Sequence, residues 1–465
     1  MVDIATGIGG FSSNEESFSS NPYDVFYEPK LNNSIGEPYT QDYRPSSQFA
    51  GENGVHYDFK IYSENTFMRL DNARIRGKAK AVKQKDGTDI TDDDTDTKIN
   101  WTVVNNIFLA LFANVALSVQ GTDISDTTTN PSLIKSYLFV LMNFTREFKK
   151  YVLSNPGFRW IADNFVGSVN IKELNNPTEA AKTEKGSHPF RKRPFRKRQK
   201  NLHKWQEFSI PLLTDLTTAK KYLPPGKLME YTLKRSEPDF YMIEHPDAEP
   251  LKIVLDDVHL VFEKVPISDA AMLEFQRTLK TKQMKMYFTQ TRMKPYAVSP
   301  GNTDWGQYEF HVGVLPRAVY MCFLKQSVWR GSRESNPYAF EKPTFNEAQL
   351  IWNSRRYPVE PWSNITESDK KVKLYEAFLA NTGTNFMDST SVPISYDEFY
   401  GNNFILAWDR TRARDNGFRY QRGEQGHLSI NLKCEAKTVT MMVIVMMCFD
   451  SVLTFEEDAA IVERL

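Results

Sequence analysis

Apolar and polar residues alternate along many short segments of the chain, which is the pattern of strands with one buried face. In the segment 229–235, Met229, Tyr231 and Leu233 share one parity, and polar residues lie between them. The segment 427–435 alternates in the same way. Long loops separate such segments and helical spacing is sparse, which together predict an all-β chain.

The alternation slips by one residue inside the segment 251–265. Its apolar residues share one parity before Asp256-Asp257 and the opposite parity after this pair. They are Leu251, Ile253 and Leu255, followed by Val258, Leu260 and Phe262. An extra residue in one strand of an antiparallel pair produces such a slip, so we predict a β-bulge or bend at Asp256-Asp257.

Helical spacing of apolar residues occurs in a few segments between the predicted strands. They are 105–112, 130–150, 268–282 and 367–380. In one of them Ser268 is a candidate N-cap, Asp269 lies in the first turn, and cationic residues gather near the end. These are the positions that helix capping and the helix dipole favour. We expect this helix to join two halves of the chain.

A length of 465 residues is compatible with two large β units. We therefore predict two eight-stranded antiparallel jelly-roll β-sandwiches side by side, with short helices in the connecting loops. The predicted organisation is an extended N-terminal arm at 1–50, a first jelly roll at 51–267, a helical linker at 268–284 and a second jelly roll at 285–465. The arm is rich in Ser, Asn, Gly, Pro and Tyr, so we expect it to have little order of its own.

The segment 438–449 is apolar on both parities. Its defining residues are Val439, Met441, Val443, Val445 and Met447. A strand of an antiparallel sandwich normally exposes one face, so an apolar strand on both parities needs a second cover. We expect this strand to lie at an inter-domain or inter-subunit contact, covered by the sister domain or by another subunit.

The composition excludes several classes of protein. Lys and Arg together number 58, as do Asp and Glu, so no overall charge draws the chain to nucleic acid or to an anionic membrane. Three cysteines without a CxxC spacing argue against a disulfide framework and a zinc site. The start of the chain does not resemble a signal peptide, and no apolar run approaches the ~20 residues of a membrane-spanning helix. We expect a soluble protein made inside a cell.

No pattern in the sequence supplies a catalytic centre. The seven histidines are scattered and form no metal-binding pair such as HExxH, and the chain has no Walker or GxSxG motif. The acidic loop 86–97 lacks the glycine at the sixth position and the distal glutamate of an EF-hand, so a solvated loop is the simpler interpretation. We therefore expect no enzymatic activity, no catalytic residue, no cofactor and no metal site.

One segment is strongly basic, because Pro-Phe-Arg-Lys-Arg at 189–193 is repeated at 194–198. Its cationic residues are Arg191, Lys192, Arg193, Arg196, Lys197, Arg198 and Lys200. Such a loop can contact a polyanion or an acidic partner, or it can act as a nuclear import signal. A solvated insertion between strands is the alternative, and the sequence leaves these readings open.

Several short motifs resemble, in their order and spacing, the double jelly-roll major capsid proteins of the Polinton (Maverick) and adintovirus group, relatives of adenovirus hexon. The resemblance extends over 57–455. Its motifs are 105–125 (NNIFLALFANVALSVQGTDIS), the corner Leu223-Pro224-Pro225-Gly226, 313–317 (GVLPR), 331–332 (GS), Asn336-Pro337 with the following YAF, and 409–411 (DRT). The basic repeat and the acidic loop are not parts of this pattern.

The resemblance implies a structural protein of a viral shell. It implies homotrimeric, pseudo-hexagonal capsomers that tile an icosahedral capsid, and the family supplies no catalytic residue. Implied partners are further copies of the chain, penton and minor capsid proteins, and viral DNA as a candidate contact of the basic loop. The implied location is the virion capsid, assembled inside the host cell, with the nucleus as a candidate site. The alternative is a β-sandwich protein that binds carbohydrate, or that binds nucleic acid through the basic loop at 190–204.

Overall fold

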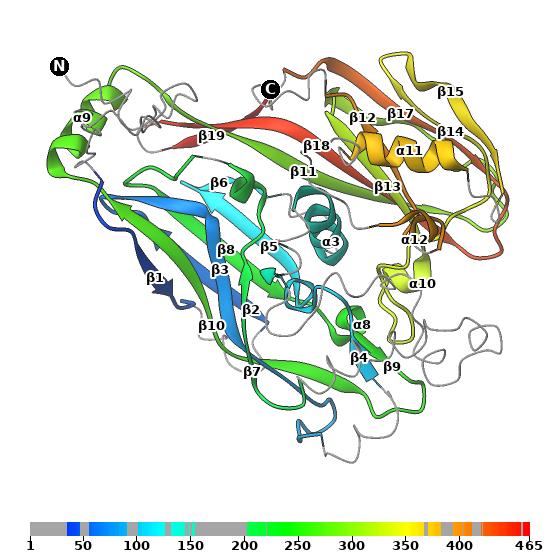
Figure 1. The fold of residues 1–465 in the computed structure, drawn as a ribbon, viewed down its shortest axis with the longest axis horizontal. Helices are drawn as coiled ribbons and strands as arrows, with labels where there is room; N and C mark the ends of the chain where they lie inside the picture. The colour runs from blue at the N-terminus through cyan, green and yellow to red at the C-terminus, as the bar shows by residue number, and fades with distance from the viewer. Residues whose placement is uncertain are drawn as a thin grey trace, which may run out of the picture.

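The structure is a computed structural model in which antiparallel sheets form two sandwiches (Figure 1). It describes residues 35–46, 55–90, 101–125, 132–144, 148, 151–153, 202–219, 221–366, 371–382, 394–401, 403–411, 420, 422–456 and 459–465. No helix among these residues is long and apolar enough to cross a bilayer.

The first sandwich consists of two four-stranded sheets. One sheet has the order β1 (Tyr39–Tyr43), β10 (Leu251–Pro266), β3 (Thr66–Lys83) and β7 (Gln206–Pro211). The other has the order β2 (His56–Tyr62), β8 (Leu228–Arg235), β5 (Phe112–Val119) and β6 (Thr122–Asp123). A separate pair joins β4 (Trp101–Val103) to β9 (Met242–Glu244).

The second sandwich repeats this arrangement. One sheet has the order β11 (Met284–Val298), β18 (Met441–Phe455), β13 (Ala318–Lys325) and β16 (Ile405–Asp409), and β19 (Ala460–Arg464) also pairs with β18. The other has the order β12 (Gln307–Val314), β17 (Gln425–Cys434), β14 (Phe345–Trp352) and β15 (Arg355–Ile365).

Both sandwiches have the same topology. When the eight principal strands of each are counted in chain order, the sheet orders are first-eighth-third-sixth and second-seventh-fourth-fifth in both. This is the double Greek key of a jelly roll. The prediction of two antiparallel jelly rolls is confirmed, and each of the eight principal strands of the first roll has a counterpart in the second.

Strand β1 lies inside the segment that the sequence assigns to an N-terminal arm. It is the first strand of the first roll and pairs with β10 from Tyr39↔Lys264 to Tyr43↔Leu260. The boundary at residue 50 is therefore too late for this strand. The sequence of β1 shows no alternation of apolar and polar residues, because this strand lies at the edge of its sheet and has no fully buried residue.

The predicted bulge in β10 is confirmed. The pairing between β10 and β3 shifts between Asp256 and His259, and Asp257 has a φ of 49°. The extra residue adopts the left-handed conformation that Asp tolerates better than most residues. This bulge reverses which residues of β10 face the core, as the slip in alternation requires.

The helices are short and lie in connections. They are α2 (Ile107–Ala110), α3 (Ser132–Asn143), η2 (Asp215–Thr218), α8 (Pro238–Tyr241), α9 (Asp269–Leu279), α10 (Gln326–Trp329), α11 (Val372–Asn381) and α12 (Tyr396–Gly401). In α9 the Ser268 hydroxyl accepts a hydrogen bond from the Ala271 amide, which confirms the predicted cap. This helix connects β10 to β11 and so joins the two rolls (Figure 1).

Candidate functional surfaces at the contact between the two jelly rolls

Strand β18 is buried along its whole length, from Met441 to Phe455. Its neighbour β13 is buried from Ala318 to Leu324. One face of this sheet packs into the second roll, and the other lies against α3 and the first roll (Figure 1). The apolar residues on both parities of β18 are therefore covered within a single chain, so this burial does not by itself require another subunit.

Val439 differs from the other residues assigned to this strand. Its side chain is 44% exposed, because the chain bends at 438–439 and β18 begins only at Met441. Met441, Val443, Val445 and Met447 are all buried.

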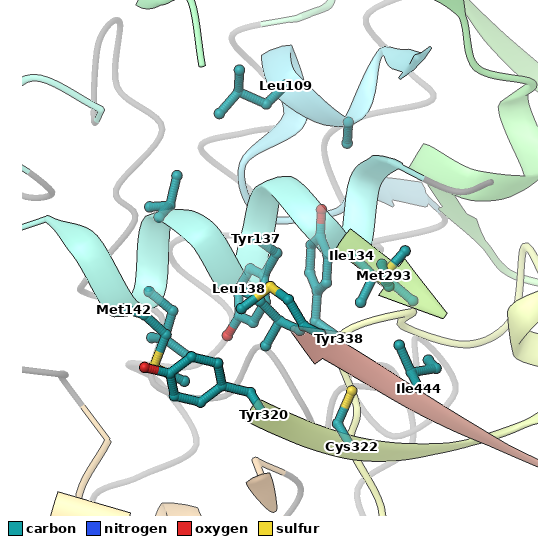
Figure 2. Packing of buried hydrophobic residues seen from close by; sticks show 14 of the residues in the cluster. Leu109, Ile134, Tyr137, Leu138, Met142, Met293, Tyr320, Cys322, Tyr338 and Ile444 are labelled. Atoms are coloured by element: carbon teal, nitrogen blue, oxygen red, sulfur yellow. The ribbon is translucent and has the colours of Figure 1, made fainter. Parts of the chain in front are cut away.

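Helix α3 of the first roll fills the space between the rolls. Figure 2 shows Tyr320 and Cys322 of β13 directed toward α3, with Met142 beside Tyr320. Tyr137 of α3 stacks on Tyr338, with ring centroids 4.1 Å apart and an interplanar angle of 14°. The apolar residues of the two rolls thus form one continuous core, which fixes how the rolls sit against each other.

An ionic cluster also joins the rolls. Arg333, in the loop after α10, places Nη1 2.7 Å from the Glu244 carboxylate and Nε 2.6 Å from the Asp239 carboxylate. Its Nη2 donates to the Gln84 side-chain oxygen at 2.6 Å. The Glu244 amide donates to the Arg333 carbonyl at 2.6 Å. One arginine of the second roll thus contacts three segments of the first.

Glu244 is the buried partner in this cluster. Its side chain is only 4% exposed, and it also accepts a hydrogen bond from the Leu251 amide at 2.9 Å. Burial raises the pKa of the Glu244 carboxyl above its ordinary value, although Arg333 and the Leu251 amide favour the ionised form. A buried ion pair of this kind fixes geometry more than it adds stability. The sequence offers no signal for it, because Arg333 and Glu244 are far apart in the chain.

The corner Leu223-Pro224-Pro225-Gly226 is structural. Leu223 is buried and bridges to Met68 through backbone hydrogen bonds of 3.0 and 2.8 Å. The Ser63 hydroxyl donates to the Pro224 carbonyl at 2.9 Å. Gly226 has a φ of 74°, which favours glycine, and its amide donates to the Glu64 carbonyl. The corner therefore anchors the loop before β8 to the turn between β2 and β3.

The motif Asn336-Pro337 positions a contact between the rolls. Asn336 is buried, and its side-chain oxygen accepts a hydrogen bond from the Tyr338 amide at 3.0 Å. This turn directs the Tyr338 ring onto Tyr137. The motif thus has a structural role in holding α3 against the second roll.

The motifs 313–317 and 409–411 meet near one end of the second roll. The Arg410 amide donates to the Arg317 carbonyl at 3.0 Å. Arg317 places Nε 3.4 Å from the buried carboxylate of Asp450. The Arg410 guanidinium lies over the rings of Trp352 and Tyr357, at 5.5 and 5.4 Å from their centroids. These contacts again tie strands together and expose no reactive group.

One small cavity, the possible metal ligands and the three thiols are the features of the described residues that bear on chemistry. A cavity lined by Lys135 and Asp215 of the first roll has a volume of about 50 Å³, whereas ligand sites usually have at least ~300 Å³. Within the described ranges, no group of three or more His, Cys, Asp or Glu side chains is placed to hold a metal ion. Cys322, Cys434 and Cys448 are buried, and burial raises the pKa of each thiol.

Two predicted segments are described only in part or not at all. The cationic residues Arg191–Arg193, Arg196–Arg198 and Lys200 lie outside the described residues. Of the acidic loop, only 86–90 is described. There the Thr88 amide and hydroxyl donate to the Asp86 carboxylate and lower its pKa, as in an ordinary Asx turn.

Comparison with known proteins gives a likeness in structure only. No family model matches the sequence, and no curated protein matches it. The major capsid protein of mavirus aligns over 97% of this chain and 96% of its own, with 9% identity and a TM-score of 0.50. The Faustovirus major capsid protein aligns over the same shares, with 9% identity and a TM-score of 0.50.

A chain of the Sputnik virophage aligns over 97% of this chain and 92% of its own, with 10% identity and a TM-score of 0.51. Identities this low establish the fold alone. The alignments cover both rolls together, since they span nearly the whole of each chain. The chain therefore has the double jelly-roll fold found in major capsid proteins of virophages and giant viruses.

Proposed function

We propose that this protein is a major capsid protein whose homotrimers are pseudo-hexagonal capsomers of an icosahedral shell. The proposal is supported by the likeness of both rolls, in one alignment, to viral major capsid proteins. The members of the Polinton and adintovirus group are the relatives that the sequence motifs favour.

The observation that carries the proposal is the way the two rolls meet. The sheet of the second roll that contains β11, β18 and β13 packs on α3 and η2 of the first roll. Two copies of the same fold thus meet through different surfaces, which is a head-to-tail contact. Head-to-tail contacts generate rings when the rotation between units closes, and filaments when it does not. Six rolls from three chains would form such a ring.

The remaining partners follow from this role. In the proposed capsid, trimers contact further trimers, and penton and minor capsid proteins complete the shell. Viral DNA is the proposed contact of the basic loop, and the virion capsid is the proposed location, with assembly inside the host cell and the nucleus as its candidate site. A net charge of zero suits repeated self-association, because like subunits then repel one another weakly.

The direct test is the native mass of the purified full-length chain, measured by light scattering, together with electron microscopy of the same sample. We expect a particle of three times the chain mass of 53.7 kDa with a pseudo-hexagonal outline. A compact monomer that persists at all concentrations, with no larger assembly, would contradict the proposal. A specific carbohydrate ligand found for that monomer would instead favour a β-sandwich binding protein.

A further inference from the structure

We propose that the outer face of the sheet β1-β10-β3-β7 is the surface that binds a second copy of the chain, and that this copy contributes its helix α11. The inference rests on the proposed trimer and names the two surfaces that would meet in it. The contact between the rolls of one chain serves as the template, because the two rolls have the same strand order.

The strand pairing gives the equivalent positions in the two rolls. Ala318 of β13 pairs with Asp409, the last residue of β16. Arg74 of β3 pairs with Pro211, the last residue of β7. Counting along both strands from these pairs, Tyr320 and Cys322 correspond to Arg76 and Lys78.

In the second roll, Tyr320 and Cys322 face α3 (Figure 2). Arg76 and Lys78 occupy the equivalent positions in the first roll. The intervening Gly77 lies against the Phe208 ring in the core of the first roll, so Arg76 and Lys78 point away from that core. Arg76 is exposed and Lys78 is half-buried. The outer face of the first roll's sheet thus carries a row of cationic side chains. The equivalent face of the second roll's sheet is apolar.

Helix α11 is the counterpart of α3. Helix α3 lies between the fifth and sixth strands of its roll, β6 and β7, and α11 lies between the fifth and sixth strands of the other roll, β15 and β16. Each helix packs on its own roll through one side. In α11 that side includes Leu374 and Phe378, which are buried.

The opposite side of α11 is uncovered within the described residues. Val372 is 57% exposed, and Glu376, four residues later on the same side, is also exposed. In α3 the corresponding side is covered by β13 of the second roll. Glu376, near the middle of this side, has the charge that would pair with Arg76 of another copy.

These observations select a second copy over an unrelated partner. The fold already contains one such contact between two rolls. In its counterpart, Arg76 on the sheet and Val372 and Glu376 on α11 all remain exposed within the described part of one chain. The contact between chains would be more ionic than the contact within a chain, because Arg76 and Lys78 replace Tyr320 and Cys322. We therefore expect trimers to separate into chains at a salt concentration that leaves each chain folded.

The test uses two full-length variants, Arg76→Cys and Glu376→Cys, mixed after separate purification and treated with a short bis-maleimide. The three natural cysteines are buried, so the new thiols are the reactive ones. We expect a covalent dimer from the mixture and none from either variant alone. The matched control is Lys60→Cys, an exposed residue on β2 in the opposite sheet of the first roll, mixed with Glu376→Cys; we expect no cross-linked dimer.

A charge exchange supplies a second measurement. Arg76→Glu and Glu376→Arg are each expected to raise the dissociation constant of the trimer by roughly tenfold or more, and their combination in one chain to restore much of the affinity. Lys60→Glu is expected to change it little. If trimers form but only the Lys60 control cross-links, or if the combined exchange fails to restore affinity, the inference is wrong while the proposed trimer stands. If the unmodified chain is a monomer throughout, both are wrong.

Discussion

The Arg333 guanidinium lies 2.7 Å from the Glu244 carboxylate and so joins the second jelly roll to the first. The Arg333 side chain is 20% exposed and that of Glu244 is 4% exposed. The pair therefore lies largely out of water, where losing one partner leaves an uncompensated charge. This geometry makes the junction between the rolls sensitive to single substitutions.

Replacing Arg333 by Met is expected to lower the free energy of unfolding by about 3 kcal/mol, because Glu244 then remains buried without its cation. Urea denaturation measures the change. The matched control is Arg277→Met, which removes an exposed ion pair with Glu274 at 3.5 Å and should change stability by less than about 0.5 kcal/mol. Equal losses in the two variants would contradict a special role for the Arg333 cluster.

The stack of Tyr137 on Tyr338 is expected to couple the rolls energetically. In a double-mutant cycle with Tyr137→Leu and Tyr338→Leu, the coupling free energy should be about 1 kcal/mol, the usual value for a buried aromatic pair. Tyr338→Phe keeps the ring and should preserve this coupling. Additive effects of the two Leu substitutions would show that the stack contributes no pairwise stabilisation.

His311 should make stability depend on pH. Burial lowers its pKa below the ordinary value, and its Nε2 lies 2.8 Å from the Val314 carbonyl oxygen. The unfolded chain takes up a proton near about pH 6.5, while folded His311 resists protonation, so stability should fall as the pH decreases below about 6.5. His311→Gln should reduce this loss, measured as unfolding free energies at about pH 7.5 and about pH 5.5. His427→Gln, at an exposed position of β17, should retain it; an unchanged pH profile in His311→Gln would refute the assignment.

The left-handed conformation of Asp257, with a φ of 49°, should distinguish residue types at the bulge. Asp257→Val is expected to be about 1–2 kcal/mol less stable than Asp257→Gly, because a β-branched residue is strained in this region. Both variants lose the carboxylate that pairs with Arg44 at 2.8 Å, so their difference isolates the backbone effect. Thermal or urea unfolding of the pair measures it, and equal stabilities would argue against the bulge.

The three thiols should be inert in the folded protein. Cys448 illustrates the reason, since burial raises its pKa to about 12 and leaves little of the reactive thiolate. Titration with a thiol reagent near pH 8 should find no reactive thiol in the native chain and all three after unfolding. Rapid labelling of any cysteine in the native state would contradict the burial of these side chains.

Patterns in the sequence predicted those features of the fold that depend on residues close together in the chain. The alternation in 229–235 corresponds to β8, the slip at Asp256-Asp257 to the bulge in β10, and Ser268 to the cap of α9. Each follows from a strand or helix period, or from a cap, which acts over a few residues. Strand β1 escaped prediction because, as an exposed edge strand, it has little apolar content.

The surfaces depend on contacts between distant segments, which a pattern along the chain does not contain. Arg333 meets Glu244, and Tyr338 meets Tyr137, only because two complete jelly rolls dock through α3. The apolar content of β18 did indicate that a second cover exists. Only the tertiary structure shows that this cover is the first roll of the same chain.

The sequence by itself therefore determined the all-β class, the two units, the bulge and the connecting helix, because strand and helix periods reflect burial on a local scale. Only the tertiary structure decided which face of each roll is apolar and covered and which is cationic and open. Arg76 and Tyr320 occupy equivalent places in two equivalent sheets, yet one is exposed and the other is buried. That difference arises because the first roll covers this face of the second roll (Figure 2), whereas the described residues place no roll against the same face of the first.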